Sequence, residues 1–410
     1  ASSAASDVYK RQIQCGEKKI MNENHGMKIT ISTLALISLW IVIVPIYSFG
    51  YQTALRMRFF CSILCMIYII SHFNSDLLKK TWFIWIYAGI TLISSVHNYG
   101  IWGISAIMND FLHPFSVLAI FIIPLIVTEA SGINKVAKVF LRCSYVYFIP
   151  TMATVILAGR VDAGWYEPYF VGNKFLLTYY FLVMFCSWGI IHIEEIQNTV
   201  KAKVKVVAFC VVGIVFSGYL YCTTGVVCYL TVLILMLVIP IRKILEKPLS
   251  IAISIVLSGA LPLGMTAILS IPRVNALLLA INETATMNAR VRIYEILMSI
   301  ITQKYWLGYG YNTLIVKERL YSNAQNGMLH IIVQFGMLGA ATLVLLCYIA
   351  TRNRYKRNKD VVEWCEFWLF ALIVAGIIEI TFGVFFYVFL ALINCATNAK
   401  EERRDEDAIY

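Results

Sequence analysis

Long apolar runs are the feature that most constrains this chain. From Ile29 to near the C-terminus, apolar stretches recur with the length of roughly 20 residues that an α-helix needs to cross a bilayer. Backbone polar groups in the hydrocarbon core must find their partners inside such a helix. The sequence therefore predicts an all-α polytopic membrane protein with about 12 transmembrane helices and a large, partly helical outer loop. The predicted spans are residues 29–49, 57–74, 82–99, 113–129, 142–159, 175–193, 204–220, 223–241, 249–270, 327–350, 363–380 and 383–397.

Composition excludes a soluble fold. The chain is 60% hydrophobic and 14% charged, with a mean hydropathy of +0.75, whereas soluble domains are about half apolar and about a quarter charged. The formal net charge of +11 comes from basic residues scattered in short groups between the apolar runs. Such a distribution argues against a nucleic-acid partner, which would need a contiguous basic patch.

The scattered basic residues instead indicate the topology. Cytoplasmic loops are enriched in Lys and Arg. With a cytoplasmic N-terminus the inside loops carry such groups, and the short outside connections are nearly free of them, with Arg56 and Arg58 as the main exception. Both termini are then predicted to be cytoplasmic. The inside groups are Lys79, Lys80, Lys135, Lys138, Lys201, Lys203, Lys205, Arg242, Lys243, Lys247, Arg352, Arg354, Lys356, Arg357 and Lys359.

Residues 1–20 differ from the rest, and the stretch from Ser2 to Gln12 resembles translated adapter sequence. We expect this segment to be non-native or a leader, with a native start at Met21 or Met27. Residues 21–410 then form one membrane domain. Nearly all of the eleven cysteines lie in apolar runs without a CxxC pair or a Cys/His cluster, so we expect buried thiols, no metal and no cofactor.

Two outer segments stand out, residues 160–174 and 271–326, because loops of this length are usually functional or disordered. The longer one contains a helical pattern over residues 289–303. At 100° per residue the pattern gives an amphipathic helix that lies on or against the membrane domain. Its predicted polar face carries Arg292, Glu295, Ser299 and Gln303, and its apolar face Tyr294, Leu297, Ile300 and Ile301.

Several polar residues are candidates for function. Arg290 projects from the apolar face of the amphipathic helix, as a snorkelling cation or as a phosphate ligand. Asn326, His330 and Gln334 form a stripe that descends into the next apolar helix, toward a cavity or toward neighbouring helices. Glu379 lies within an apolar run and is either a functional carboxylate or the partner of a buried cation or hydroxyl.

Together these features resemble the O-antigen ligase and polysaccharide polymerase superfamily of bacterial surface-glycan assembly. Its pattern is an Arg with an aromatic four residues on, a Leu-Gly-x-Gly turn, His-Asn-x-x-Leu at the start of a helix, and Gly-x-x-Gly within it. An Asn-containing motif after the first outer loop also corresponds, at Gly172-Asn173-Lys174. The other matching segments are Arg290 with Tyr294, Leu307-Gly308-Tyr309-Gly310, Gln325-Asn326-Gly327-Met328-Leu329 and Gly336-Met337-Leu338-Gly339.

The resemblance implies a metal-independent glycosyl transfer on the outer membrane face, in which a glycan leaves an undecaprenyl-diphosphate carrier and joins another lipid-linked repeat unit. Gln325 replaces the histidine of the ligases and cannot act as a base, which favours a polymerase and leaves His330 as a substitute. The expected partners are the lipid-linked oligosaccharide, membrane lipid and other glycan-assembly membrane proteins. We predict catalytic positions at Arg290, Gln325, Asn326 and His330, and substrate contacts at Arg160, Asn173, Lys174, Tyr294, Tyr309, Tyr311 and Gln334.

Three alternatives remain open at this point. A ligase would transfer the glycan to a different acceptor. A flippase or transporter for the same lipid-linked sugars would also have many spans, but transporters more often show paired repeats, and no convincing repeat is present. An acyltransferase would need an early His-based motif, and no clear one is found.

Overall fold

The computed structural model consists of α-helices. Its described part contains no β-strand, and only an isolated antiparallel bridge joins Tyr169 and Gly172. The chain divides into residues 1–34 and 35–410, and the predicted leader, residues 1–20, lies outside the described residues. The structure describes residues 30–98, 104–161, 167–247, 249–264, 267, 269–274, 276, 284–320, 323–355 and 357–398.

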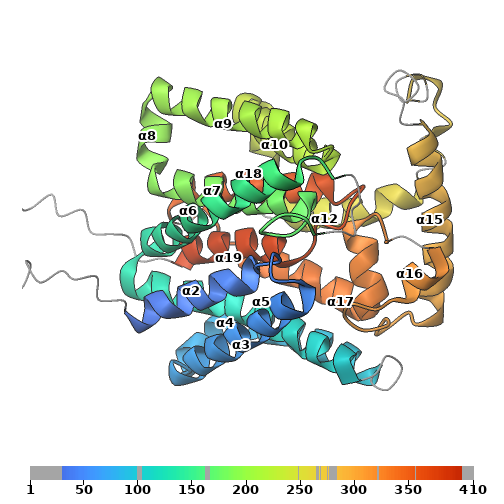
Figure 1. Cartoon of the computed structure of the whole chain (residues 1–410), viewed down its shortest axis with the longest axis horizontal. Coiled ribbons are helices and arrows are strands. Elements are labelled where there is room, and N and C mark those ends of the chain that lie inside the picture. Colours follow the sequence, from blue (N-terminus) through green and yellow to red (C-terminus); the bar gives the residue numbers. More distant parts are fainter. Residues whose placement is uncertain are drawn as a thin grey trace, which may run out of the picture. The chain divides into compact units, whose positions relative to one another are not determined.

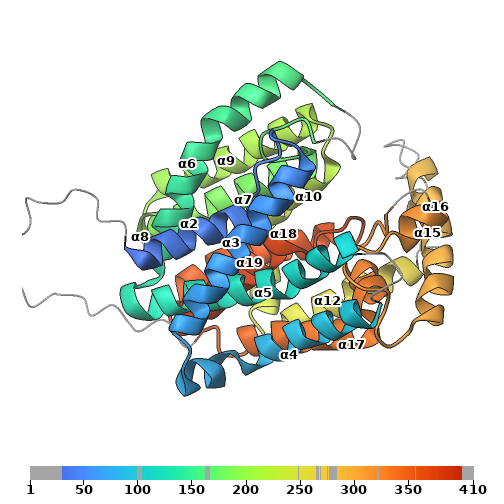
Figure 2. The same ribbon diagram turned by 60° about the horizontal axis from the view of Figure 1, so that its bottom comes forward.

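The helices of residues 35–410 form a bundle in which α19 is central, since nearly all of its residues are buried and it packs against α5, α17 and α18 (Figures 1 and 2). Side-chain caps start several helices, as when Asn74 accepts a hydrogen bond from Leu77 N (2.7 Å) ahead of α4. The helices are α2 (Ile31–Ile43), α3 (Tyr51–Ser71), α4 (Ser75–His97), α5 (Ile104–Ser131), α6 (Ile133–Ala158), α7 (Lys174–Ile191), α8 (Ile193–Asn198), α9 (Val200–Tyr219), α10 (Thr223–Leu237), α11 (Ile239–Leu245), α12 (Ser250–Leu263), α15 (Thr284–Gln303), α16 (Ile315–Leu320), α17 (Gly327–Thr351), α18 (Lys359–Ala375) and α19 (Val384–Asn398).

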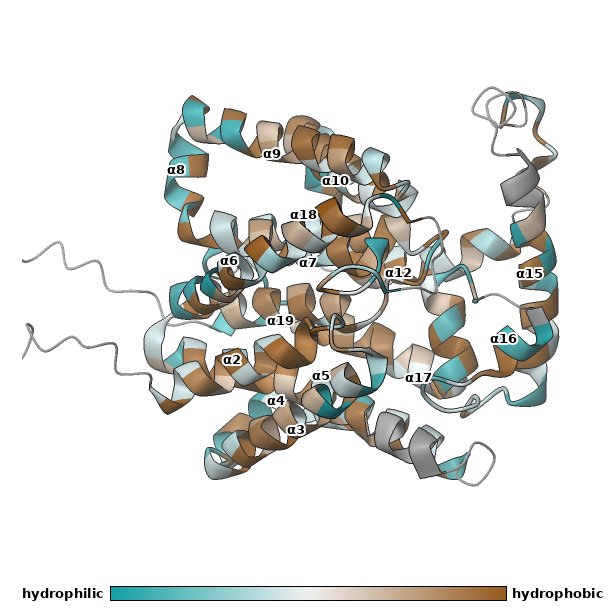
Figure 3. Ribbon diagram, in the orientation of Figure 1, coloured by the Kyte–Doolittle hydropathy of each residue, from teal (hydrophilic) through white to brown (hydrophobic). Residues whose placement is uncertain are grey.

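The apolar helices support the membrane assignment. Five of the described helices are long and apolar enough to cross a bilayer: α3, α5 over Phe111–Ser131, α6, α7 and α17. The helices α2, α10, α12 and α19 are apolar but shorter, and the count of twelve spans stays a prediction. Hydrophobic residues run along the bundle, whereas hydrophilic residues gather on α8, α15 and α16 (Figure 3).

Polar connections gather at the two ends of the bundle. One end, called the loop end below, carries α15, α16 and the connection 376–383 (right in Figure 1). The opposite end carries α8 and the groups of Lys and Arg that are predicted to lie inside, and is called the basic end. There the buried Arg354 forms an ion pair with Glu366 and donates hydrogen bonds to the carbonyls of Leu245 and Lys247 (both 2.7 Å). Arg354 therefore ties the connection between α11 and α12 to α18.

Two predicted spans end or break earlier than expected. The span 363–380 continues as helix only to Ala375, because Thr381 Oγ1 donates to the Leu372 carbonyl (2.6 Å) and caps the helix end. The span 327–350 is interrupted at Gly336, which adopts φ 66° and ψ −170° inside α17. Apolar composition sets the length of a run but does not record such local breaks.

Candidate functional site

The amphipathic helix predicted in the outer loop is present as α15. Tyr294, Leu297 and Ile300 are buried, and Arg292, Glu295 and Ser299 are exposed, so the expected division into two faces is confirmed. The buried face packs against α12 and α17. This packing fixes the direction of the residues that lie on the boundary between the two faces.

Arg290 lies on the apolar side of α15, one turn before Tyr294, and is half-buried. Its positive charge acts on Tyr294, one turn along α15, and on Glu379 in the connection between α18 and α19. Lys174, the first residue of α7, also acts on Glu379. Two cations on separate elements therefore exert their charge on one carboxylate at the loop end, and we call Arg290, Lys174 and Glu379 the charged cluster.

The carboxylate of Glu379 is half-buried and has a hydrogen bond to the neighbouring backbone. Its Oε1 accepts a hydrogen bond from Ile380 N (3.0 Å). Burial raises the pKa of Glu379, while that hydrogen bond and the charges of Arg290 and Lys174 lower it, and the pKa remains above its ordinary value. A carboxyl with a raised pKa is suited to general-base chemistry near neutral pH.

Asn326 is fully buried and caps α17, where its side-chain oxygen accepts a hydrogen bond from Leu329 N (2.8 Å). Its Nδ2 donates to the carbonyls of Ser258 (2.9 Å), Gly376 (3.0 Å) and Ile377 (3.0 Å). The Gly376 and Ile377 carbonyls follow the end of α18, where helices leave carbonyls unpaired. Asn326 thus joins α12, α17 and the end of α18, and its predicted catalytic role stays a prediction.

Gln325 precedes the cap in a left-handed conformation, with φ 47°. Its carbonyl accepts a hydrogen bond from the Tyr294 hydroxyl (2.9 Å), and its Nε2 donates to Asn323 Oδ1 (2.7 Å). The predicted motif residues Arg290 and Gln325 are therefore linked through Tyr294. Burial raises the pKa of Tyr294 to about 12, so its hydroxyl keeps the proton that this hydrogen bond needs.

The break at Gly336 is paired with the Leu-Gly-Tyr-Gly turn. In an unbroken helix the carbonyls of Val333 and Gln334 would accept hydrogen bonds from residues four positions further on. Here the Val333 carbonyl accepts from Tyr309 N (2.9 Å), and the Gln334 carbonyl accepts from Gly310 N (2.8 Å). The turn therefore takes the place of one turn of the helix.

The other side of the break is satisfied in the same way. Met337 N donates to the Tyr305 carbonyl (2.9 Å), and Leu338 N donates to the Trp306 carbonyl (3.2 Å). A Cβ on Gly336 would lie 2.2 Å from the carbonyl carbon of Trp306. Residues 305–310 and the break in α17 thus form one interlocked backbone unit, in which backbone polar groups at membrane depth are paired.

The other predicted residues of α17 and the turn are buried to different degrees. His330 is half-buried one turn beyond Asn326, and Gln334 is buried; the proposed base role of His330 stays a prediction. Tyr309 is buried and donates to the Ile300 carbonyl (3.1 Å), and its predicted substrate contact stays a prediction.

The predicted contacts of the first outer segment, residues 160–174, have different surroundings. The guanidinium of Arg160 lies 3.2 Å above the ring of Tyr221. Asn173 caps α7 by accepting hydrogen bonds from Phe175 N and Leu176 N (both 3.1 Å). Of the predicted contacts Arg160, Asn173 and Lys174, it is Lys174 that belongs to the charged cluster.

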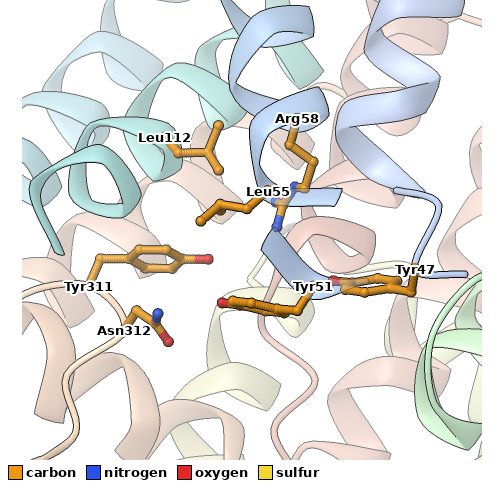
Figure 4. A pocket seen from close by; sticks show the side chains of 7 residues that line it. All are labelled: Tyr47, Tyr51, Leu55, Arg58, Leu112, Tyr311 and Asn312. Atoms are coloured by element: carbon orange, nitrogen blue, oxygen red, sulfur yellow. The ribbon is translucent and has the colours of Figure 1, made fainter. Parts of the chain in front are cut away.

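A small pocket that sequence reasoning missed opens at the same end. It has a volume of about 50 Å³, and Tyr311 is its only lining residue among the predicted contacts. Arg58 was visible in the sequence as an exception to the charge bias, which was the one available signal. The lining residues are Tyr47, Tyr51, Leu55, Arg58, Leu112, Tyr311 and Asn312 (Figure 4).

Comparisons with protein-family models, with curated proteins and with solved structures find no match for this chain. The resemblance to glycan polymerases and ligases therefore rests on the short sequence motifs alone.

Proposed function

We propose that the protein is a membrane glycosyltransferase that polymerises undecaprenyl-diphosphate-linked oligosaccharide repeat units into a surface polysaccharide such as O-antigen, capsule or exopolysaccharide. The observation that carries the proposal is the charged cluster, in which Arg290 and Lys174 act on the half-buried Glu379 from separate elements. Cations suit the diphosphate of a lipid carrier, and a carboxylate with a raised pKa suits deprotonation of a sugar hydroxyl.

An apolar groove supports a lipid-linked substrate. It runs between α12, α15 and α17, with a volume of about 540 Å³. A polyprenyl tail is apolar along its length and gains free energy by leaving water for such a surface. The groove is lined by residues that include Val256, Gly259, Met298, Ile301, Met337 and Val344.

The transfer step follows from these groups. Glu379 takes the proton of the acceptor hydroxyl, whose oxygen forms a bond to the anomeric carbon of the donor glycan. The bond from that carbon to the diphosphate oxygen breaks, and its electron pair stays on the diphosphate. Arg290 stabilises the charge that develops on this leaving group.

Substrate binding also prepares the base. The charges of Arg290 and Lys174 lower the proton affinity of Glu379 in the free protein. A bound diphosphate is anionic and offsets both cations, so the pKa of Glu379 rises further in the complex. Glu379 is then a stronger base when the donor is present than when it is absent.

The proposed site belongs on the outer face of the bacterial cytoplasmic membrane, and the basic end on the cytoplasmic face. The support is the charge bias: Lys80, which pairs with Glu129 (2.6 Å), and Arg242, which pairs with Glu363 (2.7 Å), both belong to the basic end. Cytoplasmic ends of membrane proteins are enriched in such residues. Both termini then face the cytoplasm, with twelve spans between them.

The direct test is to incubate purified protein with synthetic lipid-diphosphate repeat units, without added nucleotide, and to resolve the products by chain length. We expect a ladder from the wild type and none from Arg290→Ala, with a loss of at least about 100-fold in rate. Arg292→Ala is the matched control, because Arg292 is exposed on the opposite face of α15. Equal loss in both variants would contradict a specific role for Arg290.

A flippase for the same lipid-linked units is the second candidate, and the break in α17 favours it, because transporters bind substrates at interrupted helices. Here the freed backbone groups pair with residues 305–310, which leaves fewer of them for a substrate. In the same assay a flippase would return units of unchanged length. A ligase would give a single transfer to a separate acceptor and no ladder.

A further inference from the structure

We propose that the pocket around Arg58 is a second anion site, which binds the diphosphate of the acceptor lipid-linked unit. The inference rests on the proposed function, because a polymerase must hold two lipid diphosphates at once. The charged cluster contains both Arg290 and Lys174 around one carboxylate, so it serves a single diphosphate. The acceptor diphosphate needs cationic and hydrogen-bonding groups elsewhere at the loop end.

The pocket contains the groups that an anion requires. Arg58 is half-buried, and its Nε is buried with no hydrogen-bond partner among the residues that the structure describes. The hydroxyl groups of Tyr51 and Tyr311 point into the same space as the Arg58 guanidinium (Figure 4). A guanidinium with neighbouring hydroxyl donors is a typical arrangement for phosphate binding.

The size of the pocket selects the ligand. A volume of about 50 Å³ has room for a few water molecules, since one water needs about 10–15 Å³ on this measure. This space fits a phosphoryl group and is too small for a sugar ring. The glycan and the lipid tail of the acceptor would therefore extend out of the pocket.

The walls of the pocket are held in place before a ligand binds. The ring of His113 stacks on Tyr311 (centroids 4.5 Å apart) and on Phe335 (5.0 Å). The rings of Tyr311 and Phe335 are nearly parallel, at 4°. Tyr311 N also donates to Ser95 Oγ (3.4 Å). A rigid wall lowers the entropy lost on binding.

The hydroxyl of Tyr47, another lining residue of the pocket, stays protonated. Burial raises the pKa of Tyr47 to about 12, with Arg58 lowering it and Glu167 raising it. Its hydroxyl is therefore neutral at physiological pH. Burial likewise raises the pKa of Glu167, so this nearby acid takes up a proton more readily than an exposed glutamate.

The pocket is joined to the charged cluster through the backbone. Tyr311 directly follows the turn that pairs with the break in α17. The first part of α17 begins at Asn326, next to Gln325, which is linked to Tyr294 and so to the turn of α15 that carries Arg290. The interlocked unit thus sets the position of the acceptor pocket relative to the donor cluster.

The test is calorimetric titration of the full chain in lipid nanodiscs with farnesyl diphosphate. We expect two bound molecules per wild-type chain, and one in Arg58→Gln, with affinity at the lost site at least about tenfold weaker. Arg56→Gln is the matched control, because Arg56 is exposed on the same helix, and it should retain both. Two full-affinity sites in Arg58→Gln, or the same loss in Arg56→Gln, would overturn the proposal.

Further arms separate the causes of a negative result. Tyr311→Phe keeps the ring stack, removes one hydroxyl and should weaken the same site if Arg58→Gln fails to fold. Inorganic pyrophosphate should bind the site more weakly than farnesyl diphosphate, and equal affinity would overturn the lipid assignment.

If the wild type builds no glycan but Arg58→Gln loses a diphosphate, the pocket stands and the polymerase fails. If polymer forms and Arg58→Gln keeps its acceptor KM, the pocket fails and the polymerase stands.

Discussion

At the scale of single residues, the base is the position on which sequence and structure diverge most. The sequence favours His330, because it follows Asn326 by one helical turn and Gln325 stands where the ligase motif has a histidine. The structure offers Glu379, which lies in a connection at the loop end within the fields of Arg290 and Lys174. A carboxylate whose proton affinity responds to a bound diphosphate is the better-motivated base.

Glu379→Gln should lower kcat by about 100-fold or more, the usual contribution of a general base, while Glu379→Asp should keep part of the activity. Burial raises the pKa of Glu379 above its ordinary 4.5. Because the deprotonated form is the base, activity should rise with pH, with a midpoint above 4.5. The pH profile of wild-type activity measures this midpoint. A carboxylate that only supports the fold would not determine the midpoint of that profile.

His330→Gln is the matched comparison in that experiment. If His330→Gln loses the ascending limb of the pH profile and Glu379→Gln keeps it, the roles are reversed and Glu379 is not the base.

Charge patterns explain which site residues could be predicted. Arg290 stood out because a cation interrupts an apolar helical face, and Tyr294 was placed by the same periodicity. The hydrogen bonds of Asn326 could not be predicted, since a sequence does not show which carbonyls an amide reaches. The Arg58 pocket depends on residues from three distant segments, 47–58, 112 and 311–312, and no local sequence pattern predicts that they meet.

At the scale of elements, α15 shows what periodicity can predict, and α17 shows what it cannot. The 100° pattern placed the two faces of α15 correctly, because burial follows that period in any helix against a surface. The break in α17 depends on one left-handed glycine and on hydrogen bonds from a segment about 30 residues earlier. The sequence of an apolar run that contains a glycine does not show whether another segment will pair with a break in the helix.

Gly336→Ala should destabilise the protein by at least about 2 kcal/mol, the scale of a strained left-handed residue, with an added clash against the Trp306 backbone. Thermal unfolding in detergent, followed by tryptophan fluorescence, measures the change. Gly89→Ala in α4 is the control, because a Cβ there meets nothing within 4 Å, and it should be neutral or slightly stabilising. A neutral Gly336→Ala would show that the break is not held by this contact.

At the scale of the whole molecule, the scattered basic residues become one feature, the basic end. Its groups are far apart in sequence, yet Arg354 joins the connection before α12 to α18. This grouping could be predicted from the sequence, because each cytoplasmic loop is by itself enriched in Lys and Arg. The number of spans was harder to predict, since helices such as α10 and α12 are shorter than their apolar runs.

Cysteine labelling tests the orientation. Arg292→Cys on α15 and Lys201→Cys at the start of α9 are both exposed positions, at the loop end and the basic end. A membrane-impermeant maleimide should label Arg292→Cys in intact cells and Lys201→Cys only after lysis, with the wild type as background. The opposite pattern would place the charged cluster in the cytoplasm and remove its access to outward-facing lipid-linked units.

The central claim is that this protein transfers a glycan from a diphosphate carrier. The most direct measurement is the amount of free polyprenyl diphosphate released per new glycosidic linkage, in proteoliposomes supplied with synthetic lipid-linked repeat units. The account predicts one carrier released per linkage by the wild type and almost none by Glu379→Gln. Movement of the units across the membrane without release of carrier and without growth in length would contradict it.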